Sequence, residues 1–146
     1  MVTRFVHDLD SGILLDMWIP RNVDHVPGAR GLVRSVAETV LGDGDRAYDV
    51  GVCASETISN AVLHGKGDDV HVFVCTDESC LSVEVSHADS GGLPREQVEG
   101  AESGRGLRIV SALADRWTYV VEWETERLYV AFDFDIEPCP DSGGVP

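Results

Sequence analysis

The chain has 146 residues with a hydrophobic fraction of 43%, enough apolar material for one folded domain rather than a disordered chain. Its formal net charge is −15, so nucleic acid and anionic lipid surfaces are expected to repel it. An acidic surface suits a basic protein partner, although it can equally serve solubility alone. No apolar run approaches the ~20 residues of a membrane span. The N-terminus lacks the basic and apolar segments of a signal peptide. We therefore expect a cytoplasmic protein.

The N-terminal part of the chain predicts a strand followed by a helix. The strand is expected over residues 13–20, where an apolar run closes with a proline. Asp24 is the expected N-cap of the helix, and Pro27 stands in the first turn, where a missing N–H costs little. The apolar residues behind it follow a helical period: Val26, Ala29, Val33, Val36, Ala37 and Val40. Gly42 and Gly44 are expected to end this helix.

The rest of the chain predicts two more helices and four more strands. A second helix is expected from about Asp45 to Leu63, stopped by Gly65 and Gly67. The remaining expected elements are strands at 70–75 and 81–86, a glycine-rich acidic loop at 89–103, a helix at 105–114, and strands at 117–123 and 128–134.

This order of elements favours an α+β fold over a doubly wound parallel sheet, because the helices are few and clumped. We expect a two-layer sandwich, with a mixed, largely antiparallel sheet and about three helices on one face. Residues 1–136 are expected to form a single domain. The tail at 137–146, rich in Pro, Gly and Asp, is expected to be disordered.

The four cysteines form no CxxC pair and no His/Cys cluster with zinc spacing. Cys53 falls within a helical pattern and is expected to be a small buried apolar residue. Cys75 and Cys80 flank a predicted hairpin turn and can face each other across the strands. In a reducing cytosol we expect free thiols.

Three polar side chains repeat at four-residue intervals along the second predicted helix. Glu56, Asn60 and His64 therefore share one face of that helix. A carboxylate can act as a general base toward a hydroxyl or water, and a neutral amide oxygen suits Mg²⁺ that already carries phosphate oxygens. The alternative interpretation is an ordinary solvated helix face.

Two glycine-containing segments complete the candidate site. Ser103-Gly104-Arg105-Gly106-Leu107 directly precedes the third predicted helix, where backbone N–H groups can approach an anion. The alternative is a turn with Ser103 as a helix cap. Earlier in the chain, His87 and the run Asp89-Ser90-Gly91 follow a predicted strand. A carboxylate there can accept a hydrogen bond from a base amino group, whereas the alternative is an ordinary acidic loop.

In this order, ExxxNAxxH, an Asp/Gly strand end and GRGL before a helix resemble the N, G1 and G2 boxes of the Bergerat-type (GHKL) ATPases. Within that superfamily the chain resembles the RsbW/SpoIIAB group of anti-sigma factors with serine kinase activity, in its actinobacterial form. The resemblance spans residues 19–134. It implies ATP and Mg²⁺ as cofactors, a sigma factor and an anti-anti-sigma (STAS) protein as partners, and a homodimer.

The resemblance also implies roles for individual residues. Glu56 matches the general base and Asn60 the Mg²⁺ ligand. The phosphate-binding segment is matched by Gly104, Arg105, Gly106 and Leu107. Arg105 can reach a phosphate or face solvent, and His64 is expected to brace the site.

The G1 box can be aligned in two registers. Counting from the strand, His87 takes the position of the adenine-binding aspartate, and adenine recognition would be weak. Counting back from the glycines, Asp89 and Gly91 supply the Asp-x-Gly, and recognition is preserved. Two functions therefore stay open: a serine/threonine kinase that also sequesters a sigma factor, and a non-catalytic anti-sigma module with a degenerate nucleotide site.

Overall fold

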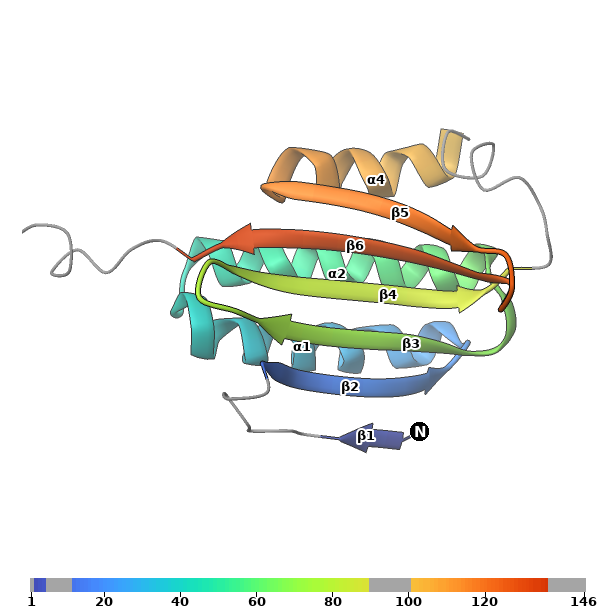
Figure 1. Ribbon diagram of the computed structural model, residues 1–146, viewed down its shortest axis with the longest axis horizontal. Coiled ribbons are helices and arrows are strands. Elements are labelled where there is room, and N and C mark those ends of the chain that lie inside the picture. Colours follow the sequence, from blue (N-terminus) through green and yellow to red (C-terminus); the bar gives the residue numbers. More distant parts are fainter. Residues whose placement is uncertain (1, 5–11, 90–100, 137–146) are drawn as a thin grey trace, which may run out of the picture.

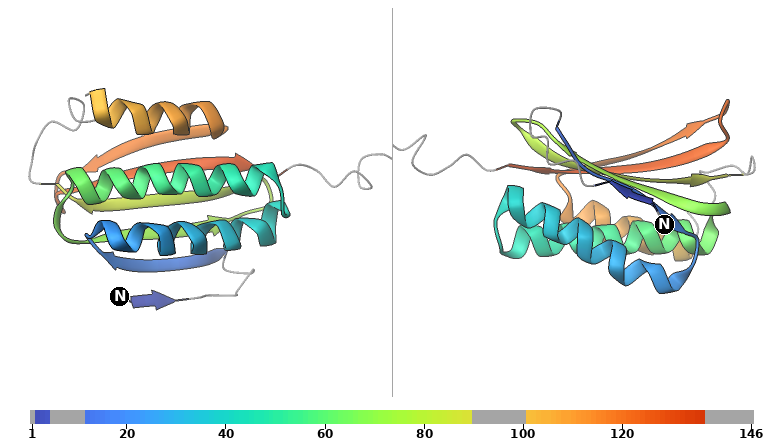
Figure 2. Two further views of the ribbon diagram at one scale, coloured as in Figure 1. Left: turned by 180° about the vertical axis from the view of Figure 1, so that it is seen from behind. Right: turned by 90° about the horizontal axis from the view of Figure 1, so that it is seen from below.

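The computed structural model describes residues 2–4, 12–89 and 101–136, with side chains over 12–89 and 107–136. Within these ranges one sheet has the strand order β1-β2-β3-β4-β6-β5, and every pairing is antiparallel. The strands are β1 (Val2–Arg4), β2 (Ile13–Pro20), β3 (Lys66–Thr76), β4 (Cys80–Ala88), β5 (Arg116–Glu122) and β6 (Arg127–Asp135). The helices α1 (Val26–Leu41), α2 (Asp45–His64) and α4 (Ala101–Leu113) lie on one face of this sheet (Figures 1 and 2).

The core lies between the sheet and the helices because alternate strand residues point toward the helices. In β3 the inward residues are Val70, Val72 and Val74, and all three are fully buried. The helices turn apolar faces of small and branched residues toward the sheet. These residues are Val33 and Ala37 of α1, Val50, Ala54, Ile58, Ala61 and Val62 of α2, and Leu107 and Val110 of α4. This is the predicted α+β two-layer sandwich, and the fold class is confirmed.

Three local predictions need correction. Asp24 does not cap α1: the side chain of Asn22 accepts the N–H of Asp24 at 2.9 Å and caps a short 3-10 turn, η1 (Val23–His25), that leads into α1. An Asn side chain satisfies such a turn locally, so it outcompetes the later aspartate. The third helix begins at Ala101 rather than at Arg105, since Ala101 and Glu102 are good helix formers. Ser103 is therefore within the helix and is not its cap.

The cysteines near the hairpin do not lie opposite each other. The register places Cys75 opposite Ser82 and Cys80 opposite Asp135. Both are free thiols, as is the buried Cys53. In the part of the chain that the structure describes, no helix is long and apolar enough to cross a membrane. The tail at 137–146 lies outside the described residues.

Candidate functional site

The three predicted motif segments meet at one end of the molecule. The C-terminal end of α2, the end of β4 and the beginning of α4 lie together at the right of Figure 1, and the rear view of Figure 2 agrees. Helix α2 contacts both α1 and α4 and thus forms the central wall of the helical layer. Segments far apart in sequence are thereby brought together around the last turns of α2.

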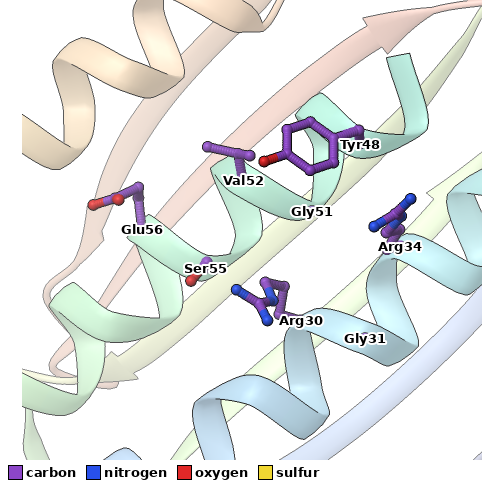
Figure 3. A pocket seen from close by; sticks show the side chains of 8 residues that line it. All are labelled: Arg30, Gly31, Arg34, Tyr48, Gly51, Val52, Ser55 and Glu56. Carbon is purple, nitrogen blue, oxygen red and sulfur yellow. The ribbon is translucent and has the colours of Figure 1, made fainter. Parts of the chain in front are cut away.

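The polar face of α2 is half-buried rather than freely solvated. Glu56, Asn60 and His64 are each of intermediate exposure, while the opposite side of the helix is fully buried against the sheet. The carboxylate of Glu56 points away from α1 (Figure 3). The predicted polar stripe therefore lies along the boundary between core and solvent.

The end of β4 holds a buried carboxylate. Asp89 is only 5% exposed, and its backbone N–H donates to the carbonyl oxygen of Glu126 at 2.7 Å. Its Oδ2 atom is buried and has no hydrogen-bond partner in the described structure. Leaving such an acceptor unsatisfied is costly, and none of the described residues supplies its donor.

His87, two residues earlier, is also buried but is already engaged. Its Nδ1 atom lies 2.9 Å from the carbonyl oxygen of Ala88, and because a carbonyl only accepts, Nδ1 carries the proton. Burial lowers the pKa of His87, and the charges of Arg127 and Arg21 lower it further, against the opposing effects of the Ala88 bond and Asp89. The ring is therefore neutral at pH 7 and packs against Gly65 at the end of α2.

Arg21 forms hydrogen bonds with the backbone at and just after the end of α2. Its Nη1 atom donates to the carbonyl oxygen of Val62 at 2.9 Å, and its Nε atom donates to that of Gly67 at 2.8 Å. Sequence reasoning missed Arg21 and Glu126. The side chain of Arg21 bonds to backbone carbonyls, and the backbone carbonyl of Glu126 accepts from Asp89. These partners are distant in sequence, so no local signal marks either residue.

The segment predicted to bind phosphate lies in the first turns of α4. Gly104, Arg105 and Gly106 are helical, and their side chains lie outside the described part of the molecule, as does Gly91 of the G1 box. Leu107 is 7% exposed, so its side chain is buried and does not face a ligand. The helix N-terminus faces the end of the molecule where β4 and α2 finish (Figure 1).

A second concave feature lies on the outer surface of α1 and α2. This groove encloses about 450 Å³ and is lined by Arg30, Gly31, Arg34, Tyr48, Gly51, Val52, Ser55 and Glu56 (Figure 3). Sequence reasoning found only Glu56 among these residues. The available signal was the four-residue spacing of Arg30 and Arg34, which places two cations on one helix face.

Metal binding by protein side chains alone is not indicated in the described residues. They contain no group of three or more His, Cys, Asp or Glu side chains that could hold an ion.

Residues 19–130 match the family of the histidine kinase-like ATPase domain. The chain belongs to this family. Among solved structures, a chain of the SiaB–SiaC complex from Pseudomonas aeruginosa is similar to this histidine kinase-like ATPase domain. The match covers 88% of this chain and 93% of that chain, with a TM-score of 0.53 and 14% identity. At that identity the likeness establishes the fold alone. Curated protein sequences gave no match.

These comparisons confirm the predicted resemblance at the level of the family and its fold. Membership of the histidine kinase-like ATPase family supports a regulatory role that depends on binding ATP. The roles of Glu56, Asn60 and the other individual site residues stay predictions.

Proposed function

We propose that this protein binds Mg·ATP, phosphorylates a serine or threonine of an anti-anti-sigma (STAS) partner and sequesters a sigma factor. The family supplies the ATP-binding framework, and the similar solved structure is a complex of two proteins, SiaB and SiaC. The single observation that carries the proposal is the buried Oδ2 atom of Asp89, which has no hydrogen-bond partner among the residues that the structure describes.

Asp89, rather than His87, is assigned as the adenine ligand. The exocyclic amino group of adenine is a hydrogen-bond donor, and the Oδ2 atom of Asp89 is a buried acceptor to which no described residue donates. His87 uses its Nδ1–H on Ala88 and packs against Gly65. These contacts favour the second register of the G1 box and a functional nucleotide site.

The same end of the molecule would offer groups suited to the phosphates and the metal. Asn60, one turn after Glu56 on α2, would supply an amide oxygen to Mg²⁺. The N-terminus of α4 would face the phosphates, where the unpaired N–H groups of the first turn and the helix dipole favour anions. Gly104 and Gly106 follow that turn and, having no side chain, would let a phosphate come close to the helix. His64 would brace this face, and Arg105 would reach a phosphate.

Glu56 is assigned as the general base. ATP, when bound, supplies an activated γ-phosphoryl group. Glu56 takes the proton of the partner's hydroxyl as that oxygen bonds to the γ-phosphorus, while the bond from this phosphorus to the bridging oxygen of ADP breaks. Asn60 and the α4 N-terminus hold the phosphate end in line, because positioning and charge stabilisation provide most of the catalysis in phosphoryl transfer.

The decisive experiment is calorimetric titration with ATP and Mg²⁺. We expect the parent to bind, Asp89→Asn to lose affinity because an amide cannot offer the same acceptor, and Asn60→Ala to lose the Mg²⁺ dependence. Glu56→Ala should keep nucleotide binding but lose transfer to the partner, typically by ~10²–10⁴-fold for a positioned base.

A non-catalytic module is the alternative that the same experiment separates. If the parent binds no nucleotide at millimolar ATP yet retains a sigma factor in a pull-down, the protein is a binding module on an ATPase fold. If Asn60→Ala binds Mg·ATP as tightly as the parent, the ligand assignment is wrong.

We also infer a homodimer that uses the face of the sheet opposite the helices. That face carries Trp18, 37% exposed, stacked on His71 at 4.3 Å between ring centroids. No described helix covers it (Figure 2). Sedimentation equilibrium with Trp18→Ala tests this, since a monomer in both the parent and the variant would contradict it.

A further inference from the structure

The connection from α2 to β3 contains two glycines and lies at the nucleotide end of the molecule. Gly65 follows the last residue of α2, and Gly67, near the start of β3, has a φ of 80°. Glycine gives the backbone wide conformational freedom at such points. The connection by itself therefore does little to fix the last turn of α2, which follows Asn60 directly.

Arg21 bridges the two sides of this connection. Its Nη1 atom donates to the carbonyl oxygen of Val62 in the last turn of α2 at 2.9 Å, and its Nε atom donates to that of Gly67 at 2.8 Å. Its own backbone N–H donates to the carbonyl oxygen of Asp68 at 2.9 Å, so the residue that carries the guanidinium is held at the start of β3. Because a guanidinium presents its N–H groups in a rigid plane, the two side-chain bonds fix the two carbonyl groups relative to each other.

The positive charge of Arg21 also suits the end of a helix. The last four carbonyl groups of an α-helix lack partners within the helix and form the negative end of its dipole. In α2 the carbonyl of Ala61 accepts the N–H of Gly65 at 2.9 Å, and that of Val62 accepts Arg21. A cation that donates to such a carbonyl stabilises the last turn.

The contacts of Arg21 extend to the end of β4 through the sheet. Arg21 bonds to the backbone at the start of β3, where Lys66 lies opposite Ala88 of β4. Asp89 comes directly after Ala88. Arg21 thus lies between the last turn of α2 and the strand pair that carries Asp89.

The charge of Arg21 is felt at the end of β4 as well. Burial is the largest cause of the lowered pKa of His87, and the charges of Arg127 and Arg21 lower it further. A neutral His87 forms no ion pair with Asp89, so it leaves the charge of that carboxylate unneutralised. The titration of His87 therefore reports on the charge of Arg21.

We propose that Arg21 is a positioning residue of the nucleotide site: it holds the last turn of α2, and with it Asn60, in a fixed place relative to Asp89. In this role Arg21 acts through the carbonyl oxygens of Val62 and Gly67 and not on the nucleotide itself. This inference rests on the binding of Mg·ATP proposed above and adds the residue that fixes the metal ligand relative to the adenine ligand.

The test is calorimetry of the full chain and of the variants Arg21→Lys and Arg21→Gln, with ATP and Mg²⁺ and again with ATP and EDTA. Because Asn60 is the proposed Mg²⁺ ligand, its displacement should weaken binding of Mg·ATP roughly three- to tenfold and binding of metal-free ATP less. A general loss of structure would weaken both equally. Arg30→Gln, the same change on an exposed residue of α1, should bind as the parent does.

Two NMR measurements on the ¹⁵N-labelled chain need no nucleotide. The amide of Gly65 should exchange with solvent roughly three- to tenfold faster in both Arg21 variants, whereas that of Gly51, in the middle of α2, should exchange at the parent's rate. His87 should titrate at a higher pH in Arg21→Gln, because a charge that lowers its pKa is removed. In Arg21→Lys, which keeps the charge, it should titrate as in the parent.

An Arg21→Gln variant that binds Mg·ATP as tightly as the parent, or that loses affinity equally with and without Mg²⁺, would overturn the assignment. Exchange of Gly65 at the parent's rate would overturn it too. A parent that binds no nucleotide refutes the proposed function, and the exchange of Gly65 then still decides whether Arg21 holds the end of α2. A parent that binds Mg·ATP beside an Arg21→Gln variant of equal affinity refutes the role of Arg21 alone.

Discussion

Gly65 is the position at which one added carbon should disturb the nucleotide end of the fold most. It follows α2 directly, with φ −73°, so an alanine there meets no backbone strain. Its Cβ atom, however, would overlap the carbonyl oxygen of Ala61 and would lie 2.8 Å from Nδ1 of His87. Both contacts are far inside van der Waals distance, so Gly65→Ala must displace the end of α2, the His87 ring, or both.

The loss in the free energy of unfolding can be estimated from the groups that Gly65→Ala must displace. Overpacking by a methyl group typically costs about 1–3 kcal/mol. The Ala61 carbonyl also accepts the N–H of Gly65 at 2.9 Å, and weakening that bond adds about 0.5–1.5 kcal/mol. We expect the free energy of unfolding to fall by roughly 2–4 kcal/mol. At about 3 °C per kcal/mol for a chain of this size, the melting temperature should fall by roughly 6–12 °C.

Thermal and guanidinium unfolding followed by circular dichroism measure this change, with Gly28→Ala as the control. Gly28 lies within α1 and its Cβ would meet nothing within 4 Å, so alanine there should stabilise by about 0.5–1 kcal/mol. In a His87→Ala background the cost of Gly65→Ala should shrink but not vanish, because the Ala61 contact remains. A Gly65→Ala protein as stable as the parent would refute the packing of α2 on His87.

Two further predictions follow from buried titratable groups. Because the pKa of folded His87 lies below the 6.5 of an ordinary histidine, the unfolded chain binds a proton first. The free energy of unfolding should therefore fall as pH drops through about 6.5 and level off below the lowered pKa. The loss is at most about 1.4 kcal/mol per pH unit for one proton, and urea unfolding should show it reduced in His87→Gln. Burial, assisted by the charges of Asp49 and Glu56, raises the pKa of Cys53 to about 12. Iodoacetamide at pH 8 should leave Cys53 unlabelled until guanidinium is added, as mass spectrometry will show, and rapid labelling of the folded protein would contradict its burial.

The elements that sequence reasoning predicted well are those whose signals are local. The predicted strand at 13–20 matches β2, and the helix predicted from Asp45 ends within one residue of α2. Apolar periodicity, a terminal proline and flanking glycines are properties of neighbouring residues, so one sequence carries them. The α+β class followed from the order of those elements.

Features that depend on distant contacts could not be predicted. The G1 box had two registers, and what separates them is that Nδ1 of His87 bonds to Ala88 while Oδ2 of Asp89 has no partner in the described structure. The backbone of Asp89 is held by Glu126, which adopts φ 54° in the turn before β6. A glutamate in the left-handed backbone conformation cannot be recognised from the sequence, because glycine or asparagine is the usual residue at such a position.

Helix α2 sets the positions of Glu56 and Asn60 relative to the rest of the fold. It is fixed near its start by Arg46, which lies 3.0 Å from Asp115, and near its end by Arg21, which donates to the carbonyl of Val62. Between these points one side of the helix lines the groove and Glu56 faces the other way. A shift of the helix therefore moves Glu56 and Asn60 relative to the ends of β4 and α4. We expect Gly65→Ala, which displaces the end of α2, to weaken Mg·ATP binding in calorimetry, whereas Gly28→Ala on α1 should leave it unchanged; equal affinities of the two variants would contradict this.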